Sequence, residues 1–247
     1  YEIRFCDWSS DVCSSDLTVL GTPAATNTRS AKYPQILPDS RVVFRVKAPD
    51  AQKVQIDLKK KYELAKDTGG YWIVTTDSIT EGFHYYSLLI DGVAVADPAS
   101  ETFYGMGRMA SGIEIPFHGD GYYSLKDVPH GDIRIKKYYS AVTRSWRQFY
   151  IYTPPGYDEN VNEKYPVLYI LHGGGEDERG WATQGKTDII LDNLIAENKA
   201  RPMLVVMPDG NMGTGGLAGF NENVLRSFEN ELKQDRKSTR LNSSHRT

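Results

Sequence analysis

A glycine-rich turn in the middle of the chain could present backbone amides to a negatively charged oxygen. It reads LHGGGEDERGW, from Leu171 to Trp181, and follows a hydrophobic run. Glycine has no Cβ, so the backbone at residues 173–175 can turn tightly and point an N–H group into a cleft. Such amides stabilise the oxyanion that forms when a nucleophile attacks a carbonyl carbon. We expect the amides of Gly173 and Gly174, with Gly174 the better candidate, to supply one of two donors.

Other residues near the turn are candidates for supporting or lining the site. We expect His172, which ends the hydrophobic run, to support the loop by hydrogen bonding rather than to act as a base. Gly175, Trp181 and Asn211 are candidates for binding substrate. Asn211 opens a glycine-rich stretch, residues 210–219, whose spacing matches no phosphate-binding motif. The alternative is that this stretch is only a flexible connection.

An oxyanion site needs a nucleophile, and the chain offers no serine in the expected setting. The motif G-x-S-x-G, which places a serine on a sharp strand-to-helix turn, is absent from the sequence. Ser140, Ser145 and Ser227 are expected on a strand, near a strand start and inside a helix, where no base would activate them. We therefore expect the nucleophilic serine to follow Gln234.

Both ends of the chain are expected to be non-native. Asp7–Leu17 reads DWSSDVCSSDL, and Asp235–His245 reads DRKSTRLNSSH. One nucleotide string encodes the first segment, its opposite strand encodes the second, and the string resembles a sequencing-library adapter. We assign residues 1–17 and 235–247 to adapter sequence. Residues 18–35 are interpreted as a linker, and the native part is expected to be cut at both ends.

Composition excludes several classes of function. Both cysteines, Cys6 and Cys13, fall in the first adapter-like segment, so no disulfide, zinc site or thiol nucleophile is predicted for the native part. The formal net charge is −3 and there is no basic stripe, which argues against nucleic acid as a partner. No run approaches the roughly 18 apolar residues of a membrane span. No metal or organic cofactor is implied, and the oligomeric state stays open.

Residues 36–117 have the pattern of short strands joined by turns. RVVFRVKAP alternates apolar and polar residues, KVQIDL repeats the alternation, and Asp91-Gly92 is typical of a hairpin turn. Strands at roughly ten-residue spacing predict a β-sandwich. Its aromatic residues Trp72, Tyr85 and Tyr86 could stack on sugar rings, but packing within the sandwich is the expected role.

Residues 118–234 have an α/β pattern. GDIRIKKYYSA and SWRQFYIYTPP are expected to form two antiparallel strands. After them, buried strands alternate with amphipathic helices in the order YPVLYILHG, TDIILDNLIAENK, RPMLVVMPDG and NENVLRSFENELKQ. This order predicts a mainly parallel sheet with right-handed crossovers.

The segment YPVLYILHGGGEDERGW, continued by QGKTDIILDNLIAENKARPMLVVMPDGN, resembles the esterase D-like branch of the α/β-hydrolases. Within that branch it is similar to bacterial feruloyl and acetylxylan esterases of carbohydrate esterase family one. The upstream stretch from VVFRVKAPDAQKVQI to EGFHYYSLLIDGVAVADP resembles an immunoglobulin-like module of the family-48 carbohydrate-binding type. The resemblance implies such a module at residues 36–117, followed at 118–234 by the N-terminal half of an α/β-hydrolase domain with a mainly parallel sheet.

The resemblance also implies an activity. A serine acyl-enzyme mechanism would remove feruloyl or acetyl groups from plant cell-wall polysaccharide such as xylan, in a secreted or periplasmic protein. Its serine, its histidine and the orienting carboxylate would all follow Gln234. Acylated polysaccharide or oligosaccharide would be its partner, and the chain by itself is expected to be inactive. Two alternatives are a non-catalytic carbohydrate-binding protein and a siderophore esterase of the enterochelin type. A glycosidase using Glu176, Asp177 and Glu178 is disfavoured, because consecutive loop residues cannot easily flank a glycosidic bond.

Overall fold

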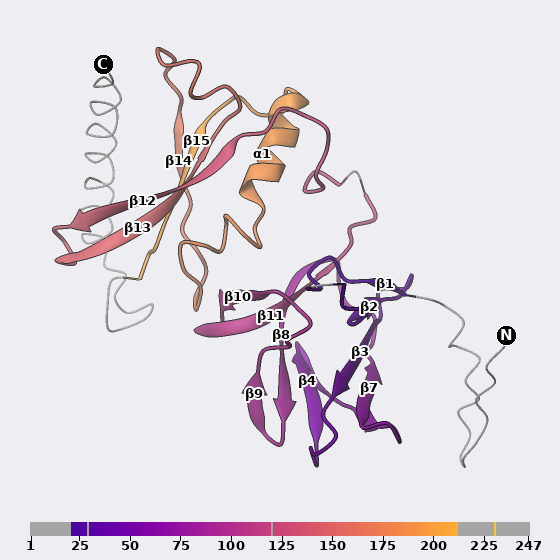
Figure 1. Cartoon of the computed structure of the whole chain (residues 1–247). Helices are drawn as coiled ribbons and strands as arrows, with labels where there is room; N and C mark the ends of the chain where they lie inside the picture. Colours follow the sequence, from indigo (N-terminus) through magenta and orange to yellow (C-terminus); the bar gives the residue numbers. More distant parts are fainter. Residues whose placement is uncertain (1–20, 29, 120, 212–229, 231–247) are drawn as a thin grey trace.

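The computed structural model of the protein describes residues 21–28, 30–119, 121–211 and 230 (Figure 1). Its strands are β1 (Thr22–Pro23), β2 (Gln35–Ile36), β3 (Val42–Lys47), β4 (Val54–Leu58), β5 (Lys60–Glu63), β6 (Ala65–Lys66), β7 (Tyr71–Thr75), β8 (Gly82–Ile90), β9 (Val93–Val95), β10 (Thr102–Gly105), β11 (Arg108–Ile115), β12 (Asp132–Ser140), β13 (Ser145–Thr153), β14 (Val167–Tyr169) and β15 (Leu204–Pro208). Among the described residues, one helix has defined bounds, α1 (Thr187–Ala196).

The N-terminal half consists of two sheets that share one apolar core. The first has the strand order β1-β2-β3-β7-β6, and the second has the order β10-β11-β8-β4-β5, with β9 paired to β8. In β4 every second side chain, at Val54, Ile56 and Leu58, is fully buried. Phe44 of β3 meets Tyr86 of β8 edge to face, with ring centroids 5.0 Å apart. Apolar alternation therefore sets which face of each strand points into the core.

Turn chemistry fits the expectation at the β8–β9 hairpin. Asp91 and Gly92 both have positive φ, 49° and 87°, as a tight two-residue hairpin turn requires. The expected packing role of two aromatic residues is also seen, since Trp72 and Tyr86 belong to the shared core. Tyr85 points to the other face of its strand, because successive strand residues alternate between faces.

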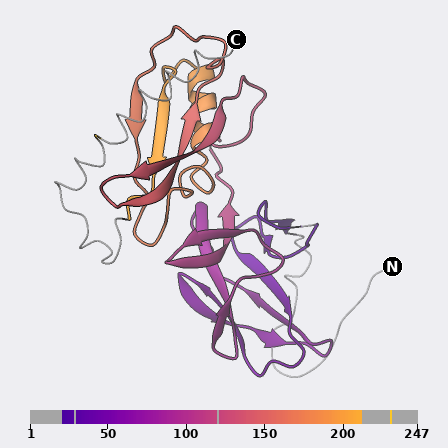
Figure 2. The same cartoon turned by 60° about the vertical axis from the view of Figure 1, so that its left-hand side comes forward.

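The C-terminal half is built on a third sheet with the order β12-β13-β15-β14. β12 and β13 form a long hairpin, and α1 lies against one face of the sheet (Figures 1 and 2). Leu191 and Ile195 of α1 pack on a cluster that includes Tyr152 of β13 and Val205 and Met207 of β15. The predicted amphipathic helix thus covers the sheet with its apolar side chains.

The expectation of a mainly parallel sheet in an α/β-hydrolase domain is wrong for the part of the chain that the structure describes. Nine residue pairs join β12 to β13 and four join β13 to β15, all antiparallel, whereas three pairs join β14 to β15 in parallel. The short connection between β12 and β13 permits only antiparallel pairing. The apolar run YPVLYILHG, expected to be buried on both faces, contributes only the three-residue strand β14. Leu168 in that strand is 46% exposed.

Several expectations fall outside the described residues. They concern residues 1–17, residues 18–20 of the linker, the glycine-rich stretch after Asn211, most of the second amphipathic helix and residues 235–247. Within the described residues, no helix combines the length and apolar character needed to cross a membrane.

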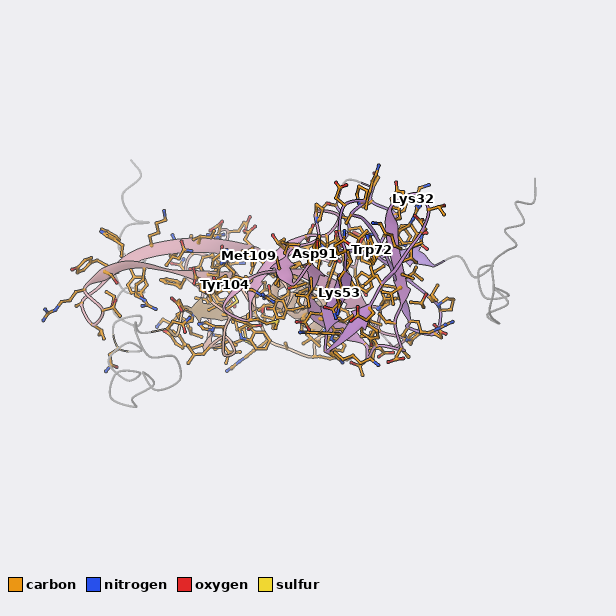
Figure 3. All side chains as sticks on the ribbon, turned by 90° about the horizontal axis from the view of Figure 1, so that it is seen from below. Lys32, Lys53, Trp72, Asp91, Tyr104 and Met109 are labelled. Carbon is orange, nitrogen blue, oxygen red and sulfur yellow. The ribbon has the colours of Figure 1, made fainter. Side chains whose placement is uncertain are left out.

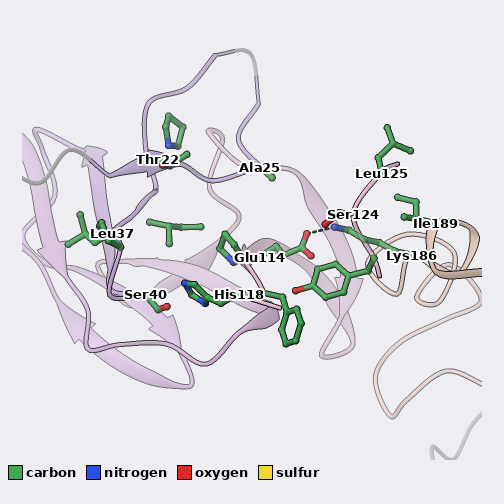
Figure 4. A pocket seen from close by; sticks show the side chains of 16 residues that line it. Thr22, Ala25, Leu37, Ser40, Glu114, His118, Ser124, Leu125, Lys186 and Ile189 are labelled. Carbon is green, nitrogen blue, oxygen red and sulfur yellow. Dashed lines mark hydrogen bonds and ion pairs between the residues drawn. The ribbon is translucent and has the colours of Figure 1, made fainter. Parts of the chain in front are cut away.

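A cavity of about 530 Å³ lies where the N-terminal sheets meet α1 (Figure 4). Apolar lining comes from Phe117, Leu125 and Ile189, and Lys186 forms an ion pair with Glu114 at its wall. No residue of the turn at 171–181 lines this cavity. It is therefore separate from the candidate oxyanion site.

The end of α1 carries a testable ion-pair cluster. The ammonium groups of Lys199 and Lys126 hydrogen-bond Glu197 and lower its pKa to about 2. Because the folded-state pKa lies below the ordinary glutamate pKa of 4.5, this stabilisation is present above pH 4.5 and is lost as the pH falls toward 2. Glu197→Gln should therefore lower Tm at pH 7, and the difference from wild type should vanish near pH 2.

Thermal unfolding measured from pH 2 to pH 7 checks this expectation. Glu159→Gln is the matched control, because Glu159 makes no ion pair within the described part of the chain. A Glu197→Gln deficit that is independent of pH would contradict the electrostatic explanation.

Candidate active site

The glycine turn leaves β14 and folds back on itself through Glu176. Gly173 N–H donates to Oε2 of Glu176 at 3.1 Å, and Glu176 N–H donates to the carbonyl of Gly173 at 3.2 Å. The first of these bonds occupies the N–H group of Gly173. Within the described part of the chain, the exposed Gly174 has no acceptor for its N–H, and a Cβ built on it would meet open space. Of the two expected donors, Gly174 is the one whose amide is free.

His172 lies under the turn with its side chain only 4% exposed. Its Nδ1 is 2.8 Å from the Gly173 carbonyl, and its Nε2 accepts a hydrogen bond of 3.0 Å from Gly210 N–H. The imidazole thus joins the ends of two loops, one after β14 and one after β15. In the neutral imidazole a proton on Nδ1 satisfies both bonds, whereas in the imidazolium Nε2–H would donate to the carboxylate of Asp209 instead.

Asp209 places a carboxylate between these two loops, in contact with His172 and Arg147. Its Oδ1 lies 3.2 Å from His172 Nε2, and its Oδ2 lies 3.3 Å from the Arg147 guanidinium. Burial lowers the pKa of His172, but the Asp209 carboxylate and the Gly173 carbonyl together outweigh it and the net pKa is raised. Burial disfavours ionisation of Asp209, yet the contacts with His172, the Asn211 amide and Arg147 lower its pKa overall. The carboxylate is therefore charged at neutral pH and draws the two loops together.

Asn211 and Trp181 flank the turn from two sides. Asn211 donates its backbone N–H to Asp209 Oδ1 at 2.8 Å and its side-chain Nδ2 to the carbonyl of Glu176 at 3.1 Å. The indole N–H of Trp181 donates to the carbonyl of Leu171 at 2.8 Å, and the residue is 41% exposed. Both side chains thus have a polar group bound to the turn, while the Trp181 ring keeps an exposed surface beside it.

Sequence reasoning missed the residues that hold the turn from the N-terminal sheets. The hydroxyl of Tyr85 donates to Oε1 of Glu176 at 2.7 Å, and Gln184 donates to the same hydroxyl. Gly107 N–H donates to the carbonyl of Gly175 at 2.8 Å. The glutamate directly after the three glycines was a sequence signal for a loop-closing group. No sequence signal marked Tyr85 as its partner, because the two residues are 91 positions apart in the chain.

Ser140 and Ser145, two described serines of this half, are not placed as nucleophiles. The hydroxyl of Ser140 is buried and accepts from Thr143 N–H at 3.1 Å. The hydroxyl of Ser145 lies 2.9 Å from that of Thr143. Among the described residues, neither hydroxyl contacts a histidine. Ser227 lies outside the described residues.

The three consecutive acidic residues that follow the glycines of the turn bind different partners. Glu176 bonds Tyr85 and Gly173 as described, Asp177 pairs with Arg179, and the buried Glu178 accepts from Gln148 at 2.6 Å. A glycosidase needs two carboxylates facing one bond. These contacts give the cluster a structural role instead. Within the described residues, no group of three or more histidine, cysteine, aspartate or glutamate side chains could hold a metal ion.

Comparison with known proteins assigns the region around this turn. Residues 140–246 match the protein family described as "Putative esterase". This segment is esterase-like. The match covers the turn, α1 and β15, and it runs through residues 235–246, so it does not separate the adapter-like segment from the rest.

Two curated relatives extend the likeness beyond the esterase-like segment. An endo-1,4-beta-xylanase/feruloyl esterase of Xylanibacter ruminicola is 40% identical over 219 residues, which cover 85% of this chain and 30% of that protein. Endo-1,4-beta-xylanase Y of Acetivibrio thermocellus is 29% identical over 156 residues, 61% of this chain and 14% of that protein. The chain thus spans less than a third of the length of either relative. These matches agree with the prediction of a carboxylic-ester hydrolase related to xylan-acting enzymes.

Among solved structures, the enterobactin esterase of Shigella flexneri shares the fold. That structure, determined in the presence of enterobactin, superposes with a TM-score of 0.59 at 17% identity. The superposed region covers 81% of this chain and 60% of the Shigella enzyme's chain. At this identity the likeness concerns the fold alone.

Proposed function

We propose that the protein is a carboxylic-ester hydrolase with a serine acyl-enzyme mechanism, and that the esterase-like segment supplies part of its oxyanion site. The observation that carries the proposal is the free amide of Gly174, held in a turn that Glu176 and His172 fix from both sides. A fixed amide stabilises a developing oxyanion without reorganising during the reaction.

The proposed division of work follows from the contacts. Gly174 N–H donates to the oxyanion, while Gly173 N–H closes the turn onto Glu176. His172 is a supporting residue, because both of its ring nitrogens already bind backbone groups of the two loops. Gly175, Trp181 and Asn211 are proposed to bind the substrate. The nucleophilic serine, its histidine and the orienting carboxylate are proposed to follow Gln234.

The proposed substrates are feruloyl or acetyl esters on plant cell-wall polysaccharide such as xylan. The support is the 40% identity to a protein that is named as a xylanase/feruloyl esterase. A polymeric substrate of this kind implies action outside the cell or in the periplasm. We further propose that residues 36–117 and 118–234 are two domains, the first of the immunoglobulin-like, carbohydrate-binding type. The separate apolar cores of the two halves support this division.

The test uses the full-length protein, meaning the product of the whole reading frame that contains this chain. We expect it to hydrolyse p-nitrophenyl acetate and to release ferulate from feruloylated xylan, whereas residues 1–247 alone should show no enzymatic rate. A parallel assay with enterobactin separates a siderophore esterase from a polysaccharide esterase. Enzymatic hydrolysis by residues 1–247 alone would place the nucleophile within this chain and overturn the assignment.

A further inference from the structure

We propose that the N-terminal sheets position the oxyanion turn, and that Tyr85 and the β10–β11 turn are the parts that do so. This inference rests on the proposed ester-hydrolase function. It assigns to the N-terminal half a direct effect on catalysis, in addition to any binding of carbohydrate. Figure 1 shows a loop of the C-terminal half reaching down to β10, and the hydrogen bonds identify the contact.

The first contact joins two tight turns through their backbones. Met106 and Gly107 connect β10 to β11 with φ values of 57° and 73°. Gly107 N–H donates to the carbonyl of Gly175, whose own φ is 79°. A Cβ on Gly175 would lie 3.0 Å from the Gly107 nitrogen, so the two backbones are as close as glycine allows. The carbonyl of Gly175, the residue after Gly174, is therefore fixed by the N-terminal half.

The second contact passes through a carboxylate. Tyr85 O–H binds Oε1 of Glu176 at 2.7 Å, and Oε2 of the same group binds Gly173 N–H at 3.1 Å. Burial, and then the bond to Glu176, raise the pKa of Tyr85, so its hydroxyl stays protonated and remains a donor. With Oε1 fixed, the glutamate cannot rotate away from Gly173. The tyrosine thus acts on the turn through Glu176 and is a positioning residue.

Further contacts hold the same surfaces together. The guanidinium of Arg179 lies over the ring of Tyr104 in β10, 5.2 Å from its centroid. Figure 3 shows Tyr104 at the end of the N-terminal sheets nearer the C-terminal half, with Lys32 at the opposite end. Lys186 pairs with Glu114 of β11. Contacts from β8, β10 and β11 thus meet the segment between the turn and α1, which favours one fixed arrangement over a mobile attachment.

The kinetic test is Tyr85→Phe in the full-length protein. We expect kcat for p-nitrophenyl acetate to fall about tenfold, because a small displacement of a preorganised group slows the chemical step. KM should stay within about twofold, since the small substrate does not reach the N-terminal sheets. Tyr71→Phe is the matched control. It removes a tyrosine hydroxyl from β7 in the other sheet, where the ring stacks 3.8 Å from the Arg45 guanidinium, and kcat should not change.

A double-mutant cycle asks whether Tyr85 acts through the carboxylate. If it does, Tyr85→Phe combined with Glu176→Ala should have the same kcat as Glu176→Ala alone. Additive losses would overturn the proposed route.

Hydrogen exchange supplies a readout that does not depend on activity. In Tyr85→Phe the Gly173 amide should exchange about tenfold faster than in wild type, while core amides of β4 stay protected. If wild type hydrolyses no ester yet the exchange result holds, the proposed function fails and the positioning contact stands. If exchange and kcat both match those of Tyr71→Phe, the positioning proposal is wrong.

Discussion

Asp192→Ala should lower the free energy of unfolding of the C-terminal half by about 3 kcal/mol, because a buried carboxylate there satisfies three donors. Asp192 is 2% exposed. Its Oδ1 accepts from Tyr152 O–H at 2.6 Å and from Gly131 N–H at 3.0 Å, and its Oδ2 lies 2.9 Å from Nδ1 of His130. Alanine would leave the hydroxyl of the fully buried Tyr152 without that bond. It would also remove the bonds that hold the residues just before β12 against α1.

Urea denaturation of the full-length protein, followed by circular dichroism, measures this loss. Asp158→Ala is the matched control in the same half, since Asp158 forms an exposed ion pair with Arg134, and solvent screening leaves such a pair with little effect on stability. Equal midpoints for the two variants would show that the Asp192 network does not stabilise this half.

Local patterns in the sequence predicted many of the strands. Val42, Phe44, Val54 and Ile56 alternate with more exposed residues and do form buried faces. The pair Asp91-Gly92 makes a hairpin, as its need for positive φ predicts. Each of these features depends on neighbours within a few residues, and that is why the sequence reveals them.

Features that depend on distant partners could not be predicted in the same way. YPVLYILHG is a largely apolar run, yet only Val167–Tyr169 form a strand. In the described sheet this strand pairs with β15, which in turn pairs with β13. Asp192 appeared as one polar position on an amphipathic helix, with no sign of the Tyr152 hydroxyl 40 residues earlier. For the candidate site, the glycines and His172 marked the turn. Tyr85 was recognised only as a packing residue, because its contact with Glu176 spans 91 positions.

Gly175→Ala in the full-length protein should reduce kcat for ester hydrolysis about a hundredfold, the usual order of loss when one oxyanion donor is misplaced. Two effects combine at this position. Alanine is strained at a φ of 79°, and its Cβ would lie 3.0 Å from the nitrogen of Gly107 and 3.1 Å from the Cα of Met106. Both contacts are to backbone atoms, which cannot rotate away. The turn must therefore shift and carry the Gly174 amide with it.

Steady-state kinetics of Gly175→Ala are compared with those of Gly92→Ala. The comparison distinguishes the effect of displacing the turn from the effect of backbone strain alone. Gly92 has a similar φ of 87° in the β8–β9 hairpin, but a Cβ there would meet open space. Gly92→Ala should therefore lose some stability and keep its kcat. Full activity in Gly175→Ala would mean that the turn adapts without moving the Gly174 amide, or that this amide does not bind the oxyanion. A loss of equal size in both variants would trace the effect to general destabilisation, because the two share the strain and differ in what lies against the added carbon.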